Sequence, residues 1–166
     1  FVSNFQLPFL VSGVVAISLI SFLDDIKPLS NKVRLFVHLI SVSLMLSQLG
    51  VLGMKWYILL ALAVVIIGII NAYNFMDGIN GITGLYSLSI ISMLFILNMD
   101  MEFIEQQLII FVGISLIVFL LFNLRKRARC FAGDVGSVSI AFLVIFLIGT
   151  LIYKTSNFAY IFFLLI

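Results

Sequence analysis

The sequence predicts an all-α fold, a polytopic bundle of transmembrane helices with six full spans and part of a seventh. Three features of the composition predict this class: 64% of the residues are hydrophobic, 10% are charged, and the mean hydropathy is +1.33. Soluble domains carry about 25% charged residues, so a water-soluble fold is excluded. We treat residues 1–166 as a single transmembrane domain.

The spans are located by six stretches that contain no Asp, Glu, Lys or Arg. Each has 19 to 23 residues and would form a helix of roughly 28 to 34 Å, which matches a hydrocarbon core of about 30 Å. The predicted spans are 7–23, 33–51, 56–72, 82–97, 107–122 and 138–153, and a seventh begins at 158. Because the chain opens on Phe1 and stops inside an apolar run at Ile166, we expect it to be an internal piece of a longer chain.

Basic residues indicate which side of the membrane each connection faces. Successive spans alternate in direction, so the connections after the first, third and fifth spans lie on one side. That side carries seven of the nine basic residues, Lys27, Lys32, Arg34, Arg125, Lys126, Arg127 and Arg129. The positive-inside rule makes this side cytoplasmic. It also carries four carboxylates, Asp24, Asp25, Asp77 and Asp134.

The first polar motif is the pair Asp24-Asp25 at the end of the first span. Adjacent carboxylates repel each other, and the helix macrodipole disfavours an anion at a C-terminus by roughly 0.3 to 1 kcal/mol. A nearby cation or a bound partner would relieve both effects. The alternative is that the pair marks the membrane boundary beside Lys27.

The second motif closes the third span with Asn71, Asn74 and Asp77, where an apolar helix reaches water. Asn71 and Asn74 share a helix face because they are three residues apart. Gly78, Gly81 and Gly84 follow, and they would let a ligand or another helix approach the backbone. Without the amides and the acid, glycines at such intervals would indicate helix packing.

The third motif, Phe131-Ala132-Gly133-Asp134-Val135-Gly136-Ser137, leads into the sixth span, and Ser137 is a plausible N-cap. Its glycines and the helix N-terminus could direct backbone N–H groups toward a phosphate. Asp134 could hold the metal ion that such a phosphate brings. The alternative is a capped turn with a solvated aspartate.

Two further features have open interpretations. The basic run from Arg125 to Arg129 serves topology and attraction to anionic headgroups, or it contacts substrate phosphates. His38, one turn beyond Arg34, is a hydrogen-bonded packing residue or the wall of a site.

Together the motifs resemble those of the polyprenyl-phosphate N-acetylhexosamine-1-phosphate transferases. This family includes the phospho-N-acetylmuramoyl-pentapeptide transferase and the UDP-GlcNAc:undecaprenyl-phosphate GlcNAc-1-phosphate transferases. The resemblance is carried by Asp24-Asp25 with Leu29-Ser30 and Arg34, by Asn71-x-x-Asn74-x-x-Asp77-Gly78, and by Phe131-x-Gly133-Asp134-x-Gly136-Ser137. It covers nearly the whole chain, which corresponds to the middle of a family member. The family's first spans and its last cytoplasmic loop, which carries a histidine-containing motif, lie outside it.

The resemblance implies transfer of N-acetylhexosamine 1-phosphate from a UDP-sugar, such as UDP-N-acetylglucosamine, to undecaprenyl phosphate. UMP is released, and the product starts a lipid-linked glycan of the cell envelope or cell wall. The implied cofactor is Mg²⁺, with Mn²⁺ as the alternative ion, and the implied location is the bacterial inner membrane with the active face cytoplasmic. No nucleic-acid partner is expected, and a homodimer is compatible with the resemblance.

The resemblance also assigns roles to individual residues. The implied catalytic acids are Asp24, Asp25, Asp77 and Asp134, of which Asp134 and Asp77 would contact the metal ion. The implied substrate contacts are Asn71, Asn74, Gly78, Asn80, Phe131, Lys32 and Arg34. Asn80 departs from the family, which commonly has an aspartate there, so it is expected to touch the nucleotide rather than a metal ion. Phe131 would offer its ring to uracil, or it is an aromatic residue of the membrane interface.

Two other functional classes are considered. An ion-coupled transporter would also contain intramembrane aspartates, but it would place them near the membrane midplane. A noncatalytic membrane scaffold would need no carboxylates at unfavourable helix ends.

Overall fold

The computed structural model describes residues 7–125 and 128–164, so Lys126 and Arg127 of the predicted basic run lie outside the described residues. The described chain forms six α-helices and one short 3₁₀ helix. They are α1 (Pro8–Ile26), α2 (Asn31–Gln48), α3 (Trp56–Met76), α4 (Ile82–Met101), α5 (Gln106–Asn123), α6 (Gly133–Thr155) and η1 (Phe158–Leu164). No strand occurs in these two ranges, so the predicted all-α class is confirmed.

Among the described residues, five helices are long and apolar enough to cross a membrane: α1, α3, α4, α5 and α6. α2 has 18 residues and lies where the second span was predicted, but Lys32, Arg34 and His38 lower its hydropathy. Residues 158–164 form a 3₁₀ helix rather than the beginning of a regular span. A multi-pass membrane bundle is therefore confirmed, whereas the count of six spans and part of a seventh is not.

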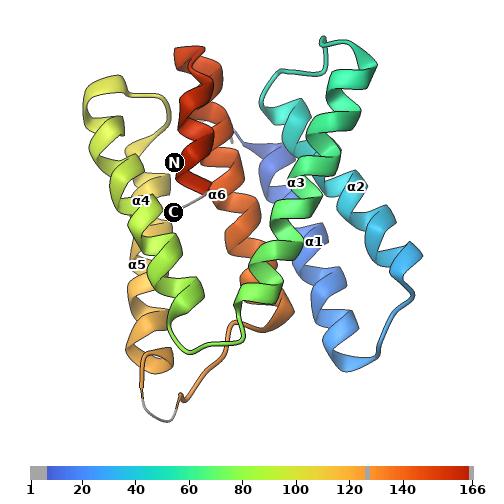
Figure 1. Ribbon diagram of the computed structural model, residues 1–166, viewed down its shortest axis with the longest axis vertical. Helices are drawn as coiled ribbons and strands as arrows, with labels where there is room; N and C mark the ends of the chain where they lie inside the picture. Colours follow the sequence, from blue (N-terminus) through green and yellow to red (C-terminus); the bar gives the residue numbers. More distant parts are fainter. Residues whose placement is uncertain (1–6, 126–127, 165–166) are drawn as a thin grey trace.

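α6 is the central helix, with α1, α2 and α3 on one side of it and α4 and α5 on the other (Figure 1). Of the 18-residue segment that makes α6 a candidate span, 56% is buried inside the bundle. The corresponding share is 22 to 39% in the other four candidate spans. Its fully buried side chains include Phe142 and Leu147. Helices in lipid associate by close packing, since lipid and side chains are equally apolar. α6 therefore joins the two halves of the bundle.

A glycine allows the closest of these contacts. A Cβ atom on Gly13 of α1 would lie 2.8 Å from Cζ of Phe142 and 3.2 Å from the carbonyl oxygen of Ser41 in α2. Neither neighbour can move easily, because Phe142 and Ser41 are both fully buried. The absence of a side chain at Gly13 thus lets α1, α2 and α6 meet at one point.

The connections of the bundle are sorted between its two ends. The α1–α2, α3–α4 and α5–α6 connections lie together at one end, the lower end in Figure 1. Contacts join them there, including a hydrogen bond from the backbone N–H of Gly81 to Asn123 and one from the N–H of Gly133 to Asp77. At the opposite end, Nζ of Lys154 donates to the carbonyl oxygen of Glu102. The four predicted site acids consequently share one end.

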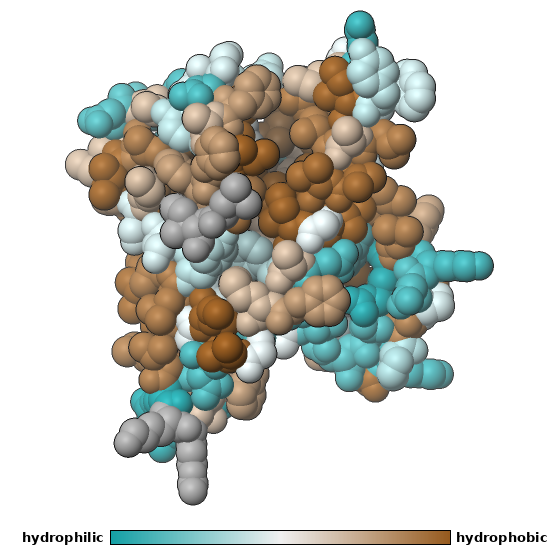
Figure 2. All heavy atoms as spheres, viewed as in Figure 1, coloured by the Kyte–Doolittle hydropathy of each residue, from teal (hydrophilic) through white to brown (hydrophobic). Residues whose placement is uncertain are grey.

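The surface agrees with a membrane environment. Figure 2 shows hydrophobic side chains over most of the face, with hydrophilic groups gathered toward the lower right, over the beginning of α2 and the α1–α2 connection. Many large apolar side chains are exposed in the middle of the helices, such as Val15 in α1, Val64 in α3 and Phe111 in α5. Exposed apolar surface of this extent needs a lipid or protein covering.

This arrangement predicts the labelling of cysteines by a membrane-impermeant maleimide. In a Cys130→Ser background, Lys32→Cys, Asn80→Cys and Arg129→Cys should react only from the cytoplasmic side, because the three connections share one end. Glu102→Cys should react only from the other side. Opposite labelling of the positions at Asn80 and Arg129 would contradict the shared end.

Candidate active site

The centre of the polar end is the guanidinium group of Arg34 in α2. Its Nη1 lies 2.9 Å from Oδ2 of Asp24 in α1, and its Nη2 lies 3.7 Å from Oδ2 of Asp134 in α6. The Asp24 side chain is 11% exposed, so this ion pair is only partly screened by water. One arginine thus brings together the first motif, the third motif and α2.

The end of α1 shows how Asp24 is tolerated there. Besides its ion pair with Arg34, its Oδ1 accepts a hydrogen bond of 2.6 Å from the backbone N–H of Leu29. That bond closes the short connection to α2. The cation expected beside the carboxylate pair is therefore Arg34, which offsets the unfavourable position at a helix C-terminus.

Asp25 has a different environment. It is exposed, and it is repelled by Asp134 and Asp24 and attracted by Arg34. Its Oδ2 lies 3.5 Å from the position that a Cβ atom on Gly133 would take, so it faces the start of α6. Three carboxylates surround one guanidinium, which leaves a formal charge of −2 on this cluster. A further cation would stabilise it.

Asp77 connects two motifs. As the C-cap of α3, it accepts a hydrogen bond of 2.8 Å at Oδ1 from Thr83 and one of 3.1 Å at Oδ2 from the backbone N–H of Gly133. The side chain thereby ties the α3–α4 connection to the first residue of α6. Each of its oxygens retains a lone pair for another ligand.

The beginning of α6 differs from the sequence-based prediction. The helix starts at Gly133, with φ of 60°, so Asp134 lies in its first turn, where the macrodipole favours an anion. The prediction that Ser137 is the N-cap is wrong, because Ser137 lies one turn inside the helix. Its hydroxyl donates to the carbonyl oxygen of Gly133 at 2.8 Å and is within 3.0 Å of Oδ1 of Asn74. Ser137 therefore connects α6 to α3.

A polar cavity of about 370 Å³ opens between α2 and α3 beside this cluster. Its lining residues are Asn31, Arg34, Leu35, His38, Ile67, Asn71, Asn74 and Phe75. His38 is buried and forms part of the wall, which agrees with the second of its two interpretations. The Asn71 amide donates to the carbonyl oxygen of Ile67, which leaves its own oxygen available. Two predicted substrate contacts, Asn71 and Asn74, thus lie in one cavity with Arg34.

The remaining predicted contacts are exposed, Gly78, Asn80 and Phe131 in the connections and Lys32 in the first turn of α2. No atom lies within 4 Å of a Cβ position on Gly78, and Phe131 is 71% exposed. Asn80 is exposed and its Nδ2 is 3.4 Å from the carbonyl oxygen of Arg125. Lys32 is also exposed, and no ion pair of Lys32 is found among the described residues. These residues face solvent near the cluster rather than contacting it.

A model of the Glycosyl transferase family 4 matches residues 7–152, which include every motif of this site. The chain belongs to this family. It is the family of polyprenyl-phosphate hexosamine-1-phosphate transferases, enzymes that transfer a sugar phosphate to a lipid carrier. No curated protein and no solved structure matches the chain.

Membership of glycosyl transferase family 4 agrees with the depth of the acids. Asp24 and Asp25 lie in the last turn of α1, Asp77 caps α3, and Asp134 lies in the first turn of α6. All four lie at helix ends, and these helix ends are at the same end of the bundle. An ion-coupled transporter would hold its ligands near the midplane, so this arrangement favours the transferase.

Asn123, which joins two connections of the candidate site, was not predicted from the sequence. It is the last residue of α5, is 4% exposed, and bonds both the α3–α4 and the α5–α6 connections. The only signal in the sequence is an amide at the end of an otherwise apolar run. The partners of that amide are backbone groups, which leave no trace in the sequence.

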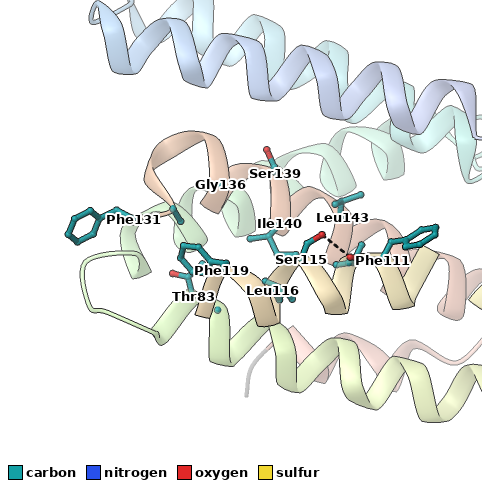
Figure 3. A pocket seen from close by; sticks show the side chains of 13 residues that line it. Thr83, Phe111, Ser115, Leu116, Phe119, Phe131, Gly136, Ser139, Ile140 and Leu143 are labelled. Atoms are coloured by element: carbon teal, nitrogen blue, oxygen red, sulfur yellow. Dashed lines mark hydrogen bonds between the residues drawn. The ribbon is translucent and has the colours of Figure 1, made fainter. Parts of the chain in front are cut away.

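An apolar cavity of about 410 Å³ lies between α4, α5 and α6, next to the third motif. Figure 3 shows Leu116, Ile140 and Leu143 in its lining, to which Phe131 also belongs, although the Phe131 ring points away from the other labelled residues. The Ser115 hydroxyl in its wall donates to the carbonyl oxygen of Phe111 at 2.8 Å. The other two hydroxyl groups of the wall also donate elsewhere, Thr83 to Asp77 and Ser139 to the carbonyl oxygen of Val135, so these hydroxyl protons are all used.

Carboxylates of the cluster could hold a magnesium ion together with the phosphates of a substrate. Within the described ranges, no group of three His, Cys, Asp or Glu side chains is placed to hold a metal ion. Mg²⁺ is commonly bound through one or two carboxylates plus substrate phosphates, so three protein acids are not required. Asp134 is partly exposed and faces the field of Asp25, and a divalent cation would relieve their repulsion.

The central ion pairs predict the effect of changing Arg34. Arg34→Gln should lower sugar-phosphate transfer by about 10²-fold, because it removes the positive charge that pairs with Asp24 and approaches Asp134 and leaves both carboxylates without it. Turnover and detergent-extracted yield of the full-length protein would be measured together. Lys27→Gln is the matched control, since Lys27 is an exposed cation of the adjacent α1–α2 connection. Equal loss in both variants would remove the special role of Arg34.

Proposed function

We propose that this protein transfers N-acetylhexosamine 1-phosphate from a UDP-sugar to undecaprenyl phosphate at the cytoplasmic face of the bacterial inner membrane and releases UMP. The product would start a lipid-linked cell-envelope glycan. One observation carries the proposal beyond family membership: Arg34 joins Asp24 and Asp134 at the end of an apolar bundle. A soluble nucleotide and the phosphate of a membrane lipid can both reach that level.

The two substrates approach the cluster from different surroundings. The nucleotide is water-soluble, and the exposed Gly78, Asn80 and Phe131 are the proposed contacts for it. The lipid phosphate is held at headgroup depth. The cavity between α2 and α3 supports a place for it, because the guanidinium group of Arg34, which can pair with a phosphate, lines this space.

In the proposed reaction, a phosphate oxygen of the lipid attacks the β-phosphorus of the UDP-sugar. A new phosphorus–oxygen bond forms, and the bond from the β-phosphorus to the bridging oxygen breaks, which leaves that oxygen on UMP. Asp25 is the acid proposed to accept a proton from the lipid phosphate. Asp24, by contrast, is occupied by Arg34 and by the N–H of Leu29.

Phosphoryl transfer depends mainly on positioning and on neutralising charge. Asp134 is the first proposed ligand of Mg²⁺, and Asp77 is the second proposed ligand. Bound there, the ion would neutralise phosphate charge. Arg34 and Lys32 would add positive charge from the protein itself, and the N-terminal turn of α6 contributes further positive potential.

The diagnostic product is UMP. Given Mg²⁺, undecaprenyl phosphate and a panel of UDP-N-acetylhexosamines, membranes containing the full-length protein should release UMP and form a lipid-linked sugar diphosphate. Attack at the β-phosphorus leaves one phosphate on uridine, whereas attack at the sugar carbon would release UDP. Nucleotide products would be separated by chromatography. Release of UDP, or product formation undiminished by EDTA, would rule out the proposal.

The Asp134→Asn variant tests the proposed metal contact. The amide keeps the shape of the side chain but loses its charge, so turnover should fall by at least about 10²-fold while the protein still inserts. Asp100→Asn is the matched control, because Asp100 is exposed at the opposite end of α4. Transfer rates and the Mg²⁺ concentration for half-maximal rate would be measured. Wild-type turnover in Asp134→Asn would remove this residue from the site.

A further inference from the structure

Asn123 is a buried amide that bonds two separate connections. Its Oδ1 accepts a hydrogen bond of 2.6 Å from the backbone N–H of Gly81, and its Nδ2 donates one of 2.8 Å to the carbonyl oxygen of Cys130. Gly81 ends the α3–α4 connection, and Cys130 lies in the α5–α6 connection. One side chain therefore fixes the separation of two loops that carry different motifs.

Asp77 makes a second tie between the same loops, through its bond to the N–H of Gly133. The two ties anchor both ends of two short segments, 77–81 and 130–133, which we call the loop frame. Between the anchors, Gly78 has open space beside it and Phe131 is 71% exposed. The frame is thus fixed at its edges and open between them.

Steric contact reinforces the Asn123 tie. Gly81 has φ of +84°, and a Cβ atom there would collide with Cδ1 of Leu124. The loop therefore packs its backbone directly against the end of α5, in a left-handed conformation that favours glycine. Asn80 adds a contact of 3.4 Å to the carbonyl oxygen of Arg125.

We propose that Asn123 is a positioning residue, which sets the separation of segments 77–81 and 130–133 and so holds Gly78, Asn80 and Phe131 in register for the nucleotide end of the donor. The inference rests on the proposed function. Asn123 acts through Gly81 and Cys130 and does not itself contact substrate. Small errors in such positioning are costly, since a displacement of about 1 Å can lower a rate by about 10²-fold.

The chain supplies a matched control for this residue. Asn98 of α4 is 2% exposed and also uses both atoms of its amide, donating 2.9 Å to the carbonyl oxygen of Ile104 and accepting 3.0 Å from its N–H. It holds the α4–α5 connection at the opposite end of the bundle. Asn98→Ala therefore removes comparable buried hydrogen bonds away from the site.

The first measurement does not depend on enzyme activity. Alkylation of the Cys130 thiol would be followed by peptide mass spectrometry in the full-length protein. Asn123→Ala should raise the rate about fivefold, the effect expected when a hydrogen bond that restrains the loop is lost. Asn98→Ala should leave it within about twofold. An unchanged rate in Asn123→Ala would show that Asn123 does not restrain the α5–α6 connection.

The second measurement separates positioning from general stability. Asn123→Ala should raise KM for the UDP-sugar about tenfold and leave KM for the lipid phosphate within about twofold. Asn123→Asp, which keeps the acceptor for Gly81 but loses the donor to Cys130, serves if the alanine variant does not fold; it should shift both readouts the same way. Equal changes in the two KM values, or the same changes in Asn98→Ala, would overturn the positioning role.

The two measurements also distinguish the inference from the proposed function. If the wild-type protein releases no UMP with any UDP-N-acetylhexosamine, the proposed function fails, yet the thiol rates still report whether Asn123 restrains the loop. If the alkylation rate of Cys130 rises while KM for the UDP-sugar stays unchanged, Asn123 only stabilises the loops. The positioning inference then fails, whereas the proposed function is not affected.

Discussion

The polar end of this bundle depends on one guanidinium group shared by two carboxylates. Asp24 and Asp25 would repel each other at the end of α1, and Asp134 would add a third negative charge. Arg34 from α2 makes the arrangement tolerable, because it pairs with Asp24 directly and extends toward Asp134. Removing one partner of such a partly buried pair leaves the other charge unpaired, which costs more than the pair itself contributes.

Arg34 neutralises only one of the three negative charges, and the charge of −2 that remains matters for the chemistry of the site. A cluster with formal charge −2 would not by itself attract a nucleotide diphosphate and a lipid phosphate. Both substrates add negative charge, so the site needs further cations, from Mg²⁺ or from basic side chains such as Lys32. In the proposed reaction, a Mg²⁺ ion that arrives with the substrate would supply the charge that the acid cluster lacks.

Sequence reasoning located the bundle and its three motifs because hydropathy and charge are properties of short segments. It failed where long-range contacts decide. The prediction of Ser137 as the N-cap placed the glycines around Asp134 before the helix. In the structure α6 begins at Gly133, whose N–H donates to Asp77, a residue 56 positions away in the sequence. Asn123 was missed for the same reason, since its partner Gly81 is 42 positions away and contributes only a backbone N–H.

The predicted count of six spans was not confirmed, for a related physical reason. The second predicted span was located by a stretch without charged residues that begins at residue 35, after Lys32 and Arg34. Both residues nevertheless belong to α2 and lower its mean hydropathy. The same two side chains are candidates for contact with phosphate. The feature that weakens the hydropathy of α2 is thus the feature that suits it to a site.

The sharing of Arg34 also bears on the order in which a growing chain enters the membrane. Asp24 and Arg34 are ten positions apart and belong to the first helical hairpin, so their charges can pair as soon as that hairpin has formed. Asp134 follows Arg34 by 100 positions and reaches it only with α6. During synthesis, the earlier pair therefore carries these two charges into the interface already neutralised. The acid cluster is complete only after α6 has been inserted, so a chain interrupted before α6 contains the Asp24–Arg34 pair without Asp134.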